Sequence, residues 1–290
     1  MNHFKKNIAR RKIVRGVSQL TSGVSTSDGM DVRLIRFIGS KELNMIDPFL
    51  LFDTFNSDQP NDYLGGFPNH PHRGFETVTY LLAGNMRHKD NAGHEGVIKA
   101  GGVQWMTAGR GIVHSEMPEQ ENGLLQGFQL WVNLPASKKY SAPNYQEFKA
   151  TDIPVEMLPK GGTIRVISGK TDKGTLGVIK NKLTEPLFLD VSLNQDTTFE
   201  QEVTSTHAGF IYIVEGSVLI GIDGTEMSKQ MLGILGNGNK VKISSKDKSC
   251  RFLLIAGKRL NEPVARGGPF VMNTKQEVQQ AFQDYEQGRF

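Results

Sequence analysis

The chain has 290 residues, of which 38% are hydrophobic and 22% charged, a composition typical of a globular protein. Its formal net charge is +4, so any attraction to polyanions is weak. No apolar run reaches membrane-spanning length, no signal peptide follows the basic N-terminus, and no helical recognition motif or aromatic-studded basic stripe indicates nucleic acid. We therefore expect neither membrane insertion nor direct nucleic-acid binding, and a cytoplasmic location, with the nucleus also accessible in a eukaryote.

Two local features of the sequence are consistent with a cytoplasmic location. A cluster of cations near the N-terminus is interpreted as a solvated tail: Lys5, Lys6, Arg10, Arg11 and Lys12. The single cysteine, Cys250, has no partner for an internal disulfide and lies in an apolar run typical of a buried strand. The lone cysteine fits a reducing compartment.

Short β-branched and aromatic runs, separated by glycine-rich turns, predict strands at 31–38, 49–55, 75–82, 96–100, 103–108 and 126–134. The next stretch is polar and contains several prolines, so we interpret 136–159 as a linker between domains at 1–135 and 160–290. Strands resume at 163–168, 187–193, 209–214, 217–222 and 251–256. Helical spacing occurs in 274–287, where Asn273 or Thr274 would be the N-cap. The pattern predicts an all-β protein with a C-terminal helix.

An internal repeat relates the two halves. The segment from Tyr80 to Gly84 resembles the segment from Tyr212 to Gly216, an offset of 132 residues. In that register Glu202 and Thr204 would fall opposite the two histidines of the first motif described next. The second copy therefore has the scaffold without the ligands.

Two short motifs predict a metal site. His70-Pro71-His72 and His114-Ser115-Glu116 each place two metal-competent side chains at i and i+2, which share a face on a strand. Three imidazoles and one carboxylate suit a first-row transition metal such as iron, manganese, nickel, copper or zinc. The remaining histidines have no convergent partner in the sequence and are expected to be solvated or packed: His3, His88, His94 and His207.

The surroundings of these motifs resemble the pirin family of bicupins. The likeness rests on the segments from Asn69 to Val78, from Gln104 to Pro118 and from Gly268 to Thr274. It implies two stacked double-stranded β-helix (jelly-roll) barrels. It also implies one iron in the N-terminal barrel, held by the residues that match His70, His72, His114 and Glu116.

Two carboxylates compete for the fourth ligand position. The general cupin pattern would nominate Glu76, whereas the pirin pattern nominates Glu116, and strand parity allows both. We choose Glu116 from the resemblance and interpret Glu76 as a partner that orients an imidazole. Gly109 and Gly111 either let the backbone bend toward the site or are simply turn residues.

The resemblance also implies function. Four protein ligands leave an octahedral metal two positions for substrate and dioxygen. Pirins resemble quercetinases, which implies that a flavonol-like aromatic substrate loses a proton to Glu116 and is opened by O₂. The alternative is an iron-dependent, redox-sensing regulator that binds a transcription factor or metabolic enzyme without turnover. A metal that only stabilises the barrel is a third possibility. A monomer is expected in each case.

Overall fold

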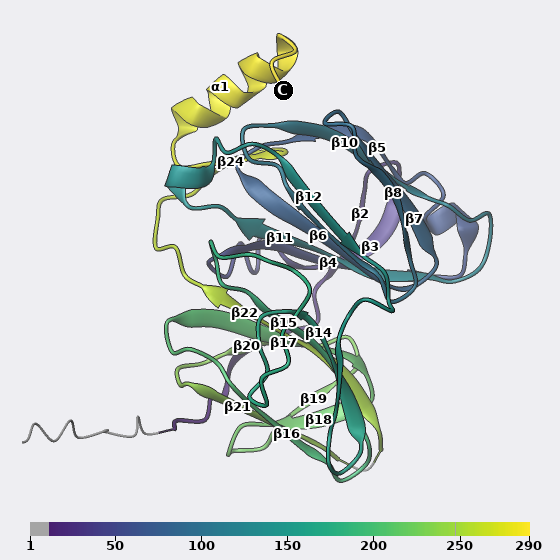
Figure 1. Ribbon diagram of the computed structural model, residues 1–290, viewed down its shortest axis with the longest axis vertical. Coiled ribbons are helices and arrows are strands. Elements are labelled where there is room, and N and C mark those ends of the chain that lie inside the picture. The colour runs from purple at the N-terminus through teal and green to yellow at the C-terminus, as the bar shows by residue number, and fades with distance from the viewer. Residues whose placement is uncertain (1–11, 247) are drawn as a thin grey trace, which may run out of the picture.

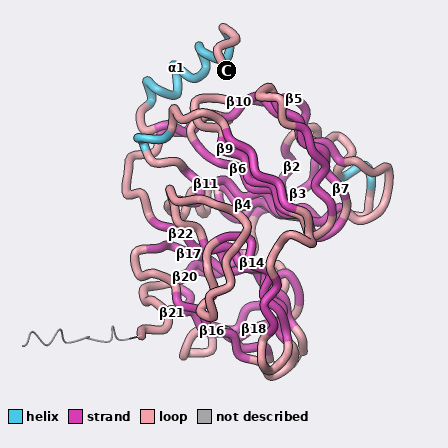
Figure 2. The backbone as a smooth tube through the Cα atoms, in the orientation of Figure 1, coloured by secondary structure: helices cyan, strands magenta, loops and turns pink. Residues whose placement is uncertain are grey.

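Strands form nearly all of the regular secondary structure in the described part of the chain. The computed structural model describes residues 12–246 and 248–290, and Figure 2 shows strands through most of this part of the chain. Two barrels are stacked one above the other in Figure 1, with the C-terminal helix at the far end of the upper one. This confirms the predicted all-β architecture of two barrels. His3 and the basic residues up to Arg11 lie outside the described residues.

The first barrel consists of a seven-stranded and a four-stranded sheet. Along the larger sheet the order is β12 (Asn144–Phe148), β9 (Val103–Thr107), β6 (Phe75–Ala83), β11 (Leu125–Asn133), β4 (Phe49–Ser57), β3 (Val32–Ile38) and β2 (Val24–Asp28). Along the smaller sheet it is β5 (Phe67–His72), β10 (Ile112–Pro118), β7 (Asn85–Asp90) and β8 (Glu95–Lys99). Two short 3₁₀ helices, η1 (Pro60–Asp62) and η2 (Ala136–Lys138), lie in connecting segments.

The second barrel repeats this plan. Its larger sheet has the order β1 (Val17–Thr21), β20 (Leu232–Leu235), β17 (His207–Glu215), β22 (Cys250–Lys258), β15 (Leu187–Leu193), β14 (Gly162–Ser168) and β13 (Val155–Met157). Its smaller sheet has the order β16 (Thr198–Glu202), β21 (Lys240–Ser245), β18 (Ser217–Ile220) and β19 (Thr225–Ser228). An apolar cluster fills the space between these sheets, and Cys250 belongs to it as a buried free thiol.

The two large sheets pack against each other through aromatic side chains. Phe52 of the first barrel contacts Phe210 and Tyr212 of the second, with ring centroids 5.1 and 5.5 Å apart. On β6, Val78 and Tyr80 belong to this buried cluster. Because neighbours on a strand face opposite ways, Thr77 and Thr79 point into the first barrel instead. The face of β6 that lines the interior of the first barrel therefore carries polar side chains.

Both ends of the described chain pack on the barrel formed mainly by the other half. Strand β1 pairs with β20 of the second barrel, while the hairpin β23 (Ala265–Gly267) and β24 (Phe270–Met272) and helix α1 (Lys275–Glu286) lie beside the first. For example, the amide of Val271 donates to the carbonyl of Arg73 at 3.0 Å. The predicted boundaries 1–135 and 160–290 need correction there, because strand periodicity does not say which sheet edge a segment joins.

The predicted linker also differs from the structure. Residues 136–159 include β12, which pairs with β9 of the first barrel, and β13, which pairs with β14 of the second. The polar composition that suggested a linker reflects edge strands, which are exposed along one side.

The helix matches its prediction closely. Its N-cap is Thr274, one of the two predicted candidates, and Glu277 completes a capping box with it. No helix in 12–246 or 248–290 is long and apolar enough to cross a membrane.

Candidate metal centre

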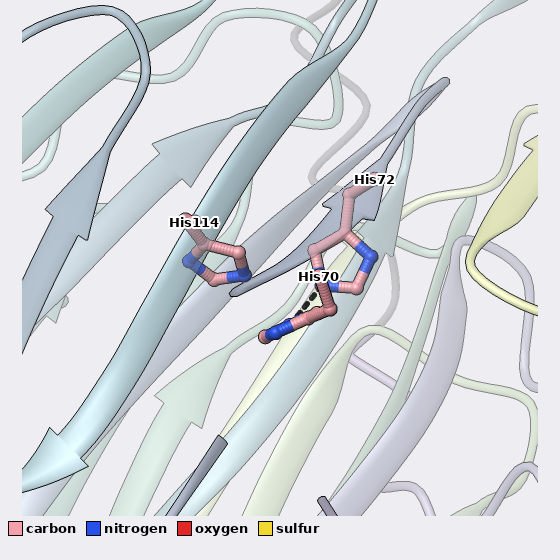
Figure 3. A group of neighbouring side chains, drawn as sticks. All are labelled: His70, His72 and His114. Carbon is pink, nitrogen blue, oxygen red and sulfur yellow. Dashed lines mark hydrogen bonds between the residues drawn. The ribbon is translucent and has the colours of Figure 1, made fainter. Parts of the chain in front are cut away.

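Three histidines from two adjacent strands converge inside the first barrel (Figure 3). Strands β5 and β10 are antiparallel neighbours, and His114 lies directly opposite His70 in their register. His72 is two residues further along β5 and shares the face of His70. One ring nitrogen from each histidine lies within 4.8 Å of the other two. The spacing of the two motifs therefore predicted this cluster correctly.

Hydrogen-bond partners fix which nitrogen of each β5 imidazole faces the cluster. His70 Nδ1 lies 2.8 Å from the carbonyl of Pro68, and His72 Nδ1 lies 3.4 Å from the carbonyl of Pro269. Carbonyl oxygens only accept, so Nδ1 is the donor in both rings and Nε2 carries a free lone pair. These two Nε2 atoms are 3.1 Å apart, joined by the dashed line in Figure 3. Two acceptors at this distance are an arrangement that a shared cation stabilises.

The third imidazole is oriented by a histidine assigned from sequence to a solvated or packing role. His88 is fully buried on β7, its Nε2 is 3.1 Å from Asp90, and its Nδ1 is 3.4 Å from His114 Nδ1. Since the carboxylate accepts, His88 donates from Nε2 and accepts on Nδ1, so His114 donates from Nδ1. Nε2 of His114 is left buried with no hydrogen-bond partner.

Sequence reasoning missed the role of His88, although a signal was present. His88-Lys89-Asp90 is itself an i, i+2 pair of metal-site residue types, like the two recognised motifs. His94 extends the chain of contacts, with its Nδ1 3.0 Å from Asp90. Burial acts to raise the pKa of Asp90, but hydrogen bonds from His88 and His94 outweigh it and lower that pKa. Asp90 is therefore held as a carboxylate.

The electrostatics of the cluster suit ligation. Burial lowers the pKa of His72 and of His114 well below the ordinary value, and the neighbouring imidazoles act in the same direction. Both rings are therefore neutral at pH 7, the form in which imidazole binds a metal. Converging neutral nitrogens and an orphaned buried acceptor fit a transition-metal ion.

Glu116 lies on the same strand face as His114 but outside the histidine cluster. Its carboxylate is buried and accepts hydrogen bonds from Thr79 Oγ1 at 2.6 Å and from Gln129 Nε2 at 2.8 Å. Each carboxylate oxygen keeps a second lone pair. The structure thus places Glu116 beside the cluster in a fixed orientation, while the convergent group itself consists of the three histidines.

Glu76 faces the other way, and its interpretation as a partner of an imidazole is wrong. It shares the outward face of β6 with Val78 and Tyr80, against the second barrel. Its carboxylate accepts from Thr107 at 2.8 Å and from Asn181 at 2.5 Å. Strand parity of the isolated segment did not reveal which face of β6 is turned toward the barrel interior.

A cavity of about 740 Å³ opens beside the histidines. His70, His72 and Glu116 line it together with apolar side chains, among them Met30, Phe55 and Phe67. Trp131 forms part of the wall, with its ring centroid 5.1 Å from that of His72. This volume is large enough for a small aromatic molecule.

The second barrel contains no equivalent cluster among the described residues. Where the repeat places the counterpart of His72, the buried guanidinium of Arg15 donates to the carbonyls of Thr204 and His207 at 2.8 and 3.0 Å. Glu202 is exposed and pairs with Lys12 at 2.6 Å. An apolar core therefore occupies the second barrel, and Arg15 bonds to backbone carbonyls at the position that the repeat assigns to the ligands.

The stacked barrels and the single histidine cluster among residues 12–246 and 248–290 define the protein as a bicupin with a candidate metal site in its first barrel. More specifically, the chain belongs to the pirin family. The pirin family model matches residues 31–132, and the model of the pirin C-terminal cupin domain matches residues 188–290.

Individual relatives agree. A pirin-like protein of Caulobacter vibrioides is 51% identical, with 96% of this chain and 99% of that protein covered. Human pirin is 46% identical, with 89% of this chain and 88% of that protein covered. A crystal structure of quercetin 2,3-dioxygenase from Acinetobacter baumannii has a TM-score of 0.87 at 32% identity, covering 96% of this chain and 98% of that one.

Proposed function

We propose that this chain is a mononuclear iron protein that opens a flavonol or related enol-bearing aromatic ring with O₂. His70, His72, His114 and Glu116 are the proposed ligands, and manganese, nickel, copper or zinc are potential substitutes. The observation that carries the proposal is the convergence of three imidazoles, with one nitrogen of each within 4.8 Å of the other two, beside an aromatic-sized cavity. Nε2 of His114 has no hydrogen-bond partner in the described part of the chain, and the Nε2 atoms of His70 and His72 face each other. The similarity to a quercetin 2,3-dioxygenase supports the reaction type.

When bound, iron supplies a Lewis acid for the enol oxygen and the redox chemistry that dioxygen requires. The chain's own residues supply the rest. Glu116 is the proposed base, since its carboxylate lines the cavity and is held in place by Thr79 and Gln129. Trp131 and the apolar side chains of the wall position a planar substrate and exclude water.

The test begins with anaerobic purification and metal analysis, followed by oxygen-uptake assays with flavonols. We expect about one iron per chain, on the ligand argument above, and oxygen consumption that depends on the flavonol. A folded preparation that neither contains nor takes up a transition metal would overturn the proposal. Metal uptake without oxygen consumption would favour the regulator, which needs the metal but no turnover.

A matched pair of variants locates the metal. His114→Ala removes the buried nitrogen without a partner and is expected to abolish binding, whereas His207→Ala changes a buried histidine of the second barrel and should leave metal content unchanged. Glu202→Ala should also have no effect, because Glu202 pairs with Lys12 at the surface. Loss of metal in either second-barrel variant would show that the site includes that barrel.

A further inference from the structure

One cation in the wall of the metal-site cavity has no carboxylate partner. Two arginines line this cavity, Arg36 and Arg266. Arg36 is neutralised, since it donates to Asp53 at 2.7 Å and to Asp28 at 2.8 Å. Arg266 makes no ion pair with any described residue.

The hydrogen bonds of Arg266 leave most of its guanidinium unused. Its Nη1 donates to the backbone carbonyls of Leu50 at 3.0 Å and Asn44 at 3.4 Å. A guanidinium has five N–H donors arranged in a fork that matches a carboxylate. Burial and the nearby charge of Arg36 act to lower the pKa of Arg266, but a guanidinium stays protonated at neutral pH. A carboxylate bound to its free donors would supply the counter-charge that Arg266 lacks.

The setting of Arg266 is also suited to an aromatic ligand. Its guanidinium carbon lies 5.9 Å from the ring centroid of Trp131, within cation–π range. Trp131 in turn contacts the ring of His72, with 5.1 Å between centroids. The charge, the indole and the histidine cluster therefore follow one another along one wall of the same cavity.

We propose that Arg266 determines specificity by binding an acidic group, such as a carboxylate, of an aromatic ligand whose enol or phenol oxygen faces the histidines. This rests on the proposed function, because the ligand would occupy the same cavity. It goes beyond the proposed function because it states that the preferred ligand carries an acidic group in addition to its enol or phenol oxygen. The C-terminal hairpin that contributes Arg266, Gly268 and Pro269 to the wall is thus part of the binding site.

The test compares two ligands that differ in one carboxylate: 3-hydroxyflavone and 3-hydroxyflavone-4′-carboxylic acid. Zinc-loaded protein is used, because zinc has no redox chemistry and binding is measured without turnover. Quenching of tryptophan fluorescence reports occupancy, since Trp131 lines the cavity. We expect the acid to bind about tenfold more tightly than the neutral flavonol, the gain typical of a charge-assisted hydrogen bond.

Variants assign the preference to Arg266. Arg266→Gln should weaken the acid to the affinity of the neutral ligand and leave the neutral ligand unchanged. Arg33→Gln is the matched control: it removes the same charge from an exposed arginine that pairs with Asp62 at 3.1 Å, and the preference should remain. Arg266→Lys should retain part of the preference, because lysine keeps the charge but not the forked arrangement of donors. If Arg266→Gln does not fold, Arg266→Lys takes its place in the test.

Equal affinity of the wild-type protein for both ligands, no binding of either, or an unchanged preference in Arg266→Gln would overturn the inference. Oxygen uptake by iron-loaded protein is measured separately. Absence of turnover with the binding preference intact would refute the dioxygenase and not the role of Arg266. Turnover of neutral flavonols without a binding preference for the acid would refute the role of Arg266 and not the dioxygenase.

Discussion

At the scale of single residues, the roles of the two buried glutamates are separated by the direction in which they face. Glu116→Gln is expected to weaken metal binding and abolish ring opening together, because a neutral amide is a poorer ligand and cannot accept the substrate proton. Glu76→Gln should leave metal content within error of wild type, since Glu76 contacts Thr107 and Asn181 on the outer face of β6. Metal analysis and oxygen uptake on both variants check this. Loss of metal in Glu76→Gln with full metal in Glu116→Gln would reverse the assignment.

His88 is expected to act on the metal through His114. His88→Ala removes the acceptor that holds Nδ1–H of His114, and loss of such a partner typically weakens metal affinity about 10- to 100-fold. Competition titration with a chromophoric zinc chelator measures the change. His94→Ala is the control, because His94 contacts Asp90 rather than a proposed ligand. Equal losses in both variants would mean that the effect comes from general disruption of β7.

At the scale of elements, the C-terminal segment completes the barrel that holds the metal site. The buried guanidinium of Arg73, adjacent to His72, pairs with Asp284 of α1 at 2.6 Å and lies 4.3 Å from the ring centroid of Phe290. Lys139 donates to the carbonyls of Gly74 and Val271, both at 2.8 Å, and so joins the same hairpin to the turn after β5. The hairpin also supplies the carbonyl of Pro269 that faces His72.

Asp284→Asn should loosen this segment locally. A hydrogen bond to a charged group typically contributes about 1.5–3 kcal/mol, and the amide loses the ionic part of the contact with Arg73. We expect faster hydrogen exchange at the amide of Val271, which bonds to the carbonyl of Arg73, with little change in the second barrel. Gln280→Ala, on the same helix, removes a neutral donor to Asp284 and should leave the exchange rate at Val271 near wild type. Uniform acceleration in both barrels would argue for global destabilisation instead.

Local patterns were sufficient for the strands and for the histidine cluster, because alternation and i, i+2 spacing are properties of neighbouring residues. They were insufficient wherever a long-range contact decides the outcome. His88 is buried by β10 and Tyr145 rather than by its own turn, Arg15 reaches the carbonyl of His207 across 192 positions, and Pro269 reaches His72 across 197 positions. Gly111 illustrates the same limit: a Cβ there would lie 2.8 Å from the ring of Phe290, so the glycine permits a distant segment to approach.

At the scale of the whole molecule, the two barrels are joined by an aromatic cluster with polar groups buried in it. Tyr80 of the first barrel donates to Asp190 of the second at 2.6 Å, and Arg251 pairs with the same carboxylate at 2.6 Å. Glu76 and Asn181 form a second polar contact between the barrels. Such groups are stabilising only when every donor and acceptor is satisfied. The protonation state of Glu76 therefore matters to the stability of the assembled pair.

Burial raises the pKa of Glu76 from 4.5 to about 7. Between these values Glu76 retains in the folded chain a proton that it releases in the unfolded chain, so its contribution to the free energy of unfolding decreases as pH rises from about 4.5 to 7 and stays low above it. The difference corresponds to roughly 3 kcal/mol at pH 8. Burial also raises the pKa of Asp53 to about 6, which gives a further decrease of the same sign.

Glu76→Gln should flatten this pH dependence. The amide oxygen can accept from Asn181 while its NH₂ donates to the hydroxyl of Thr107, so the neutral side chain keeps both contacts without ionising. Urea unfolding of metal-stripped protein at pH 5 and pH 8 is the measurement, because removing the metal eliminates the pH dependence of its binding. Over this interval we expect the free energy of unfolding of Glu76→Gln to fall by up to roughly 3 kcal/mol less than that of wild type. The remaining pH dependence, common to both proteins, comes from Asp53 in the same direction and from His72 and His114, whose lowered pKa values act in the opposite direction. Glu226→Gln, an exposed carboxylate paired with Lys246, should retain the wild-type slope, and parallel curves for Glu76→Gln and wild type would contradict the prediction.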